Sequence, residues 1–104
     1  ERKTAGVIDA IRLHGGKISA VVRNRGNVHF RVNSFLLRGR SADGAEIFSQ
    51  EIDGGYVLQG AARKIEVPFP KENCANLSVI EIEAKAAHLN LNGKLDVQQG
   101  MCNP

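Results

Sequence analysis

Residues 17–38 read Lys17-Ile-Ser-Ala-Val-Val-Arg-Asn-Arg-Gly-Asn-Val-His-Phe-Arg-Val-Asn-Ser-Phe-Leu-Leu-Arg38, the longest regular apolar pattern in the chain. Apolar and polar residues alternate over 17–23 and again over 28–33, which is the period of a half-buried strand. Asn24-Arg25-Gly26-Asn27 favours a turn between them, because Gly and Asn accept positive φ cheaply. The apolar phase then shifts at Phe35-Leu36-Leu37, which indicates a β-bulge. These residues predict two strands joined by a turn, at the centre of the core.

The rest of the chain continues as short strands separated by turn residues. We expect further strands at 6–13, 46–52, 56–58, 62–67, 77–86 and 94–98, with turns at His14-Gly15-Gly16, Asp43-Gly44, Asp53-Gly54-Gly55 and Asn92-Gly93. Asp9 interrupts the apolar face of the first strand, which is typical of a sheet edge. No segment keeps a helical period, so no substantial helix is expected. About seven strands at this spacing predict an all-β antiparallel sandwich, with a small closed barrel as the alternative.

Length and composition are those of one globular domain. The chain has 104 residues, of which 42% are hydrophobic and 24% are charged. We assign residues 6–104 to a single β-sandwich domain and residues 1–5 to a linker remnant or frayed terminus. The net charge is +3, but basic residues are scattered among acidic ones, so nucleic acid is not an expected partner. No apolar run approaches the length of a membrane span, so membrane insertion is not expected.

The residues that could carry chemistry match no catalytic pattern. Glu81 and Glu83 share one face of a predicted strand, and paired carboxylates can do acid–base work, but Lys85 beside them favours a solvent-facing surface. The histidines are read as surface side chains, two at predicted turns and one on the polar side of a strand: His14, His88 and His29. We therefore expect no enzymatic activity, no metal and no cofactor.

The two cysteines are Cys74 and Cys102. Their spacing fits no zinc site, which needs paired ligands at short spacing. A redox pair would usually be Cys-x-x-Cys. This spacing therefore disfavours a redox pair. From the residues alone, the other two interpretations stay open: a structural disulfide, or two separate buried thiols.

Two segments carry a family resemblance. Residues 18–32 combine an apolar strand, an Asn before a Gly-containing turn, and a second apolar strand. Residues 55–68 place a short apolar strand and a Gly before a basic residue and an apolar strand that ends in Pro. In these features and their spacing, residues 17–97 resemble the second domain of PapD-like periplasmic chaperones, which assemble pili in chaperone–usher systems.

The resemblance implies an immunoglobulin-like antiparallel β-sandwich, a periplasmic localisation and a role in fimbrium biogenesis. Such chaperones have two domains, and the first carries the basic residues that anchor a pilin carboxylate, so no subunit-binding residue can be assigned to this chain. The implied function is to assist folding of pilus subunits and their delivery to an outer-membrane usher. Pilin subunits and the usher would be partners of the full-length chaperone. The alternative is an extracellular binding or adhesive module, because sandwiches serve many functions.

The resemblance also bears on the cysteines, because the periplasm is oxidising and permits disulfides. The predicted strands 77–86 and 94–98 are consecutive and should pair antiparallel. That pairing places Cys74, before the first strand, and Cys102, after the second, at the same end of the sheet and within reach of each other. We therefore predict a Cys74–Cys102 disulfide.

Overall fold

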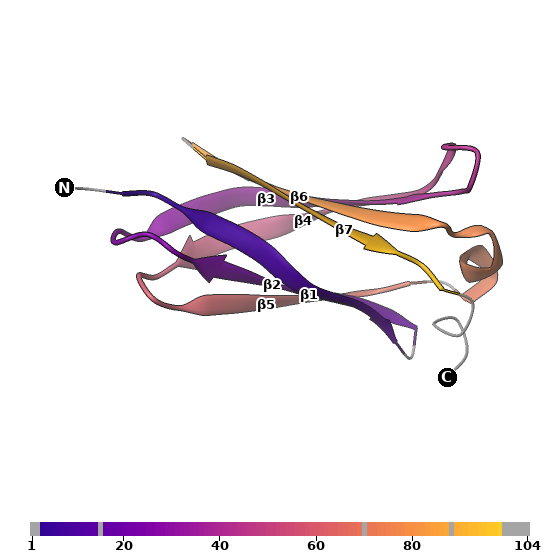
Figure 1. Ribbon diagram of the computed structural model, residues 1–104, viewed down its shortest axis with the longest axis horizontal. Helices are drawn as coiled ribbons and strands as arrows, with labels where there is room; N and C mark the ends of the chain where they lie inside the picture. Colours follow the sequence, from indigo (N-terminus) through magenta and orange to yellow (C-terminus); the bar gives the residue numbers. More distant parts are fainter. Residues whose placement is uncertain (1–2, 15, 70, 88, 99–104) are drawn as a thin grey trace.

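Two antiparallel sheets pack face to face in the computed structural model, which describes residues 3–14, 16–69, 71–87 and 89–98 (Figure 1). The strands are β1 (Gly6–His14), β2 (Lys17–Asn24), β3 (Phe30–Arg40), β4 (Glu46–Val57), β5 (Ala62–Pro68), β6 (Val79–Ala86) and β7 (Leu89–Asp96). A short 3-10 helix, η1 (Lys71–Asn76), connects β5 to β6. The predicted all-β sandwich is confirmed.

The strands are distributed as in an immunoglobulin-like sandwich. The three-stranded sheet has the order β1-β2-β5, and the four-stranded sheet has the order β4-β3-β6-β7. In the constant-type immunoglobulin domain the fourth strand joins the first, second and fifth strands. Here β4 pairs with β3 instead. Strand β1 lies at the edge of its sheet, as Asp9 indicated, and it packs beside β7 of the other sheet.

The two strands of residues 17–38 lie in different sheets. Strand β2 pairs with β1 and β5, whereas β3 pairs with β4 and β6. The predicted turn is therefore a connection between the sheets rather than the tip of a hairpin. Most of the apolar residues predicted for the core are nevertheless buried, and both sheets contribute them: Ile18, Ala20, Val22, Phe30, Val32, Phe35 and Leu37. Val28, which precedes β3, and Leu36, which faces outward, are only half-buried.

The bulge predicted in β3 is confirmed. The register of β3 against β6 shifts between Val32 and Ser34. Phe30 and Val32 are buried before the shift, and Phe35 and Leu37 are buried after it. The residues that point inward therefore change from even-numbered to odd-numbered positions. The bulge explains how one strand can carry two out-of-phase apolar runs and still bury both.

The turn predicted at Asp53-Gly54-Gly55 is wrong. These residues lie inside β4, which runs without interruption from Glu46 to Val57. Gly55 is in register with Val32 of β3. The expected short strand at 56–58 is therefore the end of β4 and not an element of its own.

The hairpin turn predicted at Asn92-Gly93 is also wrong. Both residues lie inside β7, where Gly93 is in register with Ile82 of β6. A β-carbon on Gly93 would lie 2.7 Å from Cδ1 of Ile11 in β1. Glycine is needed here because β1 packs closely over β7, which is a common reason for glycine inside a strand.

Part of the segment assigned to a linker remnant is hydrogen bonded to the sandwich. The backbone N–H of Arg25 donates to the Ala5 carbonyl at 2.9 Å, and the N–H of Asn27 donates to the Lys3 carbonyl at 2.9 Å. The Lys3 N–H donates to Oδ1 of Asn27 at 2.6 Å. The N-terminal segment thus lies beside the β2–β3 connection, at the end of the sandwich where β2 and β4 finish (Figure 1).

Candidate functional site

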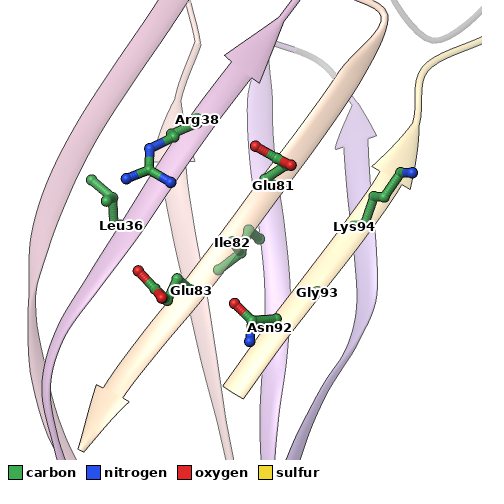
Figure 2. Close-up of a pocket in the computed structure, with 8 residues that line it drawn as sticks. All are labelled: Leu36, Arg38, Glu81, Ile82, Glu83, Asn92, Gly93 and Lys94. Carbon is green, nitrogen blue, oxygen red and sulfur yellow. The ribbon is translucent and has the colours of Figure 1, made fainter. Parts of the chain in front are cut away.

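A hollow of about 310 Å³ lies on the outer face of the four-stranded sheet (Figure 2). Leu36 of β3 is in register with Glu83 of β6, and Glu83 is in register with Asn92 of β7. Alternate residues of a strand point to the same side. The side chains of β3, β6 and β7 that are in register therefore lie next to one another in rows on the outer face of the sheet. The side chains around the hollow are Leu36, Arg38, Glu81, Glu83, Asn92 and Lys94.

The two carboxylates considered for acid–base chemistry are each held by a basic side chain. Nε of Arg40 donates to Oε1 of Glu81 at 2.7 Å. This hydrogen bond lowers the pKa of the Glu81 carboxyl, and the same bond raises the pKa of Arg40. Nζ of Lys85 lies 3.8 Å from Oε1 of Glu83. A carboxyl with a lowered pKa is a poor proton donor at neutral pH, so Glu81 is suited to polar contacts rather than to donating a proton.

The predicted exposure of two histidines is confirmed, but their local positions differ from the prediction. His14 is the last residue of β1 rather than part of a turn, and His29 precedes β3 rather than lying on it. They lie at opposite ends of the sandwich, so they cannot share a site. His88 lies outside the described residues. Within residues 3–14, 16–69, 71–87 and 89–98, no group of three or more His, Cys, Asp or Glu side chains is placed to hold a metal ion.

The described part of the chain contains no helix with the length and apolar character needed to cross a membrane.

Asn24 is a buried polar side chain at the end of β2, with 6% of its surface exposed. Its Nδ2 donates to the Val28 carbonyl at 2.8 Å and to the Val57 carbonyl at 3.0 Å. Its Oδ1 accepts from the Gly26 N–H at 2.9 Å. The side chain therefore ties the β2–β3 connection to the end of β4. The sequence indicated a turn at Asn24 but not its burial, because the Val57 partner is remote in the chain.

Two large apolar side chains are exposed where β4 ends, a feature that the sequence reasoning missed. Tyr56 is 60% exposed and Leu58 is 62% exposed. The His29 ring lies beside Tyr56, with 5.9 Å between the ring centroids. An adjacent hollow of about 650 Å³ is lined by Thr4, Asn27, Val28, His29, Leu58 and Gln59. The signal was present in the alternation, since Tyr56 and Leu58 flank the inward-facing Val57.

Cys74 is buried on η1 and is not a free thiol. Its expected partner, Cys102, lies outside the described residues, so their pairing stays a prediction. The antiparallel pairing on which the prediction relied is confirmed, because Val79 at the start of β6 is in register with Asp96 at the end of β7. The chain entering β6 and the chain leaving β7 thus lie at one end of the sheet.

No protein-family model and no curated protein matches this chain. Among solved structures, the chain is similar to the Pseudomonas fluorescens alkylpurine DNA glycosylase AlkC bound to DNA containing an abasic site analog, with a TM-score of 0.49 and 9% sequence identity. The match covers 94% of this chain and 30% of that chain, so this chain spans less than a third of the glycosylase. Similarity at this level carries no argument about fold or activity.

Proposed function

We propose that this chain is the second domain of a PapD-like periplasmic chaperone, which assists the folding of pilus subunits and delivers them to an outer-membrane usher. In this proposal the domain is not an enzyme and uses no cofactor. It supports the subunit-binding first domain, and pilin subunits and the usher are partners of the full-length chaperone.

The observation that supports this proposal is the contact between the two segments that carry the family resemblance, residues 18–32 and 55–68. Nδ2 of Asn24 in the first segment donates to the Val57 carbonyl in the second at 3.0 Å. The backbone N–H of Asn24 donates to the Ala61 carbonyl at 3.0 Å. The segments also pair along β2 and β5. The two segments that carry the resemblance are therefore joined directly by hydrogen bonds and strand pairing.

The immunoglobulin-like arrangement of the strands is a second support, because it is the architecture that the resemblance implied. A sandwich of this kind serves many functions, so the fold alone does not single out a chaperone. The proposal therefore depends on a functional test.

A second candidate, an extracellular binding or adhesive module, is favoured by the exposure of Tyr56 and Leu58 at one end of the sandwich. Neighbouring exposed apolar side chains of this size are typical of interaction sites. The two candidates differ in location. Protease added to intact cells should cleave an extracellular module and should leave a periplasmic chaperone intact.

The chaperone proposal is tested with the full-length gene product that contains this chain, produced in the periplasm with an affinity tag. A co-produced pilin subunit is expected to purify with it and to be degraded in its absence. Phe30→Ala, which empties a buried position in β3, should abolish this protection, whereas the exposed Lys17→Gln should retain it. Subunits that accumulate and assemble equally well without the protein would refute the proposal.

A further inference from the structure

We infer that one end of the sandwich binds an acidic protein segment that carries an apolar anchor residue. This inference does not depend on the proposed function. The N-terminal segment, the β2–β3 connection, the start of β3 and the end of β4 meet at this end of the sandwich (Figure 1). Their exposed side chains form a surface that is here called the end surface. It consists of Lys3, Arg25, His29, Arg31, Tyr56 and Leu58.

Contacts between these elements make the end surface continuous. Arg31 is in register with Tyr56, and residues directly opposite in an antiparallel pair lie on the same face. The His29 ring lies 5.9 Å from the Tyr56 ring, measured between centroids. The Lys3 N–H donates to Oδ1 of Asn27 at 2.6 Å, which holds the N-terminal segment against the connection. Basic and aromatic side chains from distant parts of the chain are thus neighbours.

The apolar part of the end surface offers a place for an anchor side chain. Leu58 is 62% exposed and borders the hollow of about 650 Å³ beside Val28. The lining also includes the polar side chains of Thr4, Asn27 and Gln59. Apolar contacts combined with polar groups that fix orientation are typical of recognition pockets. One leucine or phenylalanine of a partner is the kind of group that fits.

The charge around this pocket is positive. Among the described residues, Lys3, Arg25 and Arg31 form no ion pair. The acid on β1, Asp9, is already paired, with its Oδ2 lying 3.0 Å from Nε of Arg23.

One basic and one acidic side chain, Arg63 and Asp53, flank the end surface. Arg63 of β5 reaches toward β4, where its guanidinium carbon lies 2.8 Å from the position that a Gly55 β-carbon would take. Asp53, in register with Ser34, is the acid that flanks the end surface along β4. Positive side chains therefore outweigh negative ones here. Complementary charge raises association rates and selects partners, so an acidic partner fits.

A protein segment fits this surface better than a nucleic acid does. Proteins that bind single strands use a basic groove with several aromatic rings on which successive bases stack. The end surface offers the adjacent rings of Tyr56 and His29 at one place rather than a series of rings along a groove, and its other large apolar group, Leu58, has no ring to stack. Nucleic acid is therefore the competing outcome of the test.

The test measures binding of fluorescein-labelled probes to this chain by fluorescence anisotropy. The first probe is a short peptide with Leu and Phe set among Asp and Glu residues. The second has the same apolar residues with Asn and Gln in place of the acids, and the third is an oligothymidylate. We expect the acidic peptide to bind, the neutral peptide to bind at least about fivefold more weakly, and added salt to weaken the acidic peptide.

Two variants locate the site. Arg31→Glu and Leu58→Ser are each expected to weaken the acidic peptide at least about fivefold, because one reverses a charge and the other removes the apolar contact. Lys17→Glu, an exposed position at the opposite end of the sandwich, is the matched control and should leave binding unchanged. The unfolding midpoint of each variant verifies that it is folded. If only one of the two end-surface variants folds, its affinity for the acidic peptide is enough to test the site.

Four outcomes would overturn the inference. They are failure of the acidic peptide to bind, equal binding of the neutral peptide, tighter binding of the oligothymidylate, and unchanged affinity in a folded Arg31→Glu or Leu58→Ser variant. Chemical-shift changes confined to the end surface on addition of the acidic peptide would support it independently.

Discussion

Gly54 of β4 lies against the backbone of Val32 in β3, so closely that a β-carbon on Gly54 would be 1.7 Å from the Val32 carbonyl oxygen. The contact lies beside the point where the register of β3 against β6 shifts, between Val32 and Ser34. The bulge and the glycine therefore belong together, because the bulged backbone occupies the space that a side chain on β4 would need.

Gly54→Ala is therefore expected to lower the free energy of unfolding by about 3 kcal/mol, since backbone must move to admit the methyl group. Urea denaturation measures the loss. Gly60→Ala is the control, because no atom lies within 4 Å of its β-carbon position and only its φ of +72° opposes alanine. That strain costs about 1 to 2 kcal/mol. Equal losses in the two variants would contradict the close approach.

Asn24→Ala should lower the free energy of unfolding by about 2 to 4 kcal/mol, because it leaves the Val28 and Val57 carbonyls and the Gly26 N–H without their side-chain partner. Asn90→Ala, at an exposed position of β7, is the matched control and should change stability little. A small effect at position 24 would mean that the β2–β3 connection is held by other contacts.

Phe30→Ala should cost about 3 to 5 kcal/mol, because Phe30 is 6% exposed and its removal leaves a cavity in the core. Tyr56→Ala provides an internal comparison, since this aromatic side chain is 60% exposed. Thermal or urea denaturation should show a large loss for the first variant and a minor one for the second. The reverse order would show that the phase of β3 is misassigned.

Arg40→Gln removes the hydrogen bond that lowers the pKa of Glu81, so this pKa should rise toward its ordinary value. A carboxyl with a lowered pKa stabilises the fold above its unfolded pKa, and that stabilisation disappears as the pH falls through the folded pKa. The stability difference between wild type and Arg40→Gln should therefore be present at neutral pH and shrink in acid.

An NMR titration of the Glu81 side chain measures the shift directly, and denaturation at several pH values measures its consequence. Lys17→Gln removes a distant positive charge and should leave the titration of Glu81 as it is. If the pKa of Glu81 is the same in wild type and in Arg40→Gln, the Arg40–Glu81 hydrogen bond does not stabilise the charged carboxylate.

Mass spectrometry of the unreduced, denatured protein tests the Cys74–Cys102 disulfide, which should leave no thiol free to alkylate. Replacing both cysteines by serine should lower the free energy of unfolding by about 3 to 4 kcal/mol, because the unfolded chain loses a constraint. Reduction of the wild type should have a similar effect. Two alkylatable thiols before reduction would refute the bridge and weaken the case for a periplasmic protein.

The alternation of apolar and polar residues was enough to find the strands and their buried sides. It predicted that Ile18, Val22 and Phe30 point into the core, and the phase shift before Phe35 predicted the bulge. These features depend on local geometry, since successive side chains of a strand point to opposite faces. The antiparallel pairing of β6 with β7 followed in the same way, because the two strands are consecutive.

Tertiary structure alone decided what the glycines do and which sheet each strand joins. Gly54 and Gly93 resemble turn residues in sequence because glycine accepts unusual φ values, but they are needed inside strands for the space that Val32 and Ile11 occupy.

Where the chain leaves one sheet for the other after β2, Asn24 is bonded to Val57 and Ala61, residues far along the chain. The same crossing brings Tyr56 beside His29 and Arg31 and so builds the end surface. Local sequence sets the direction of each side chain, whereas the neighbour that it meets depends on how distant strands pack.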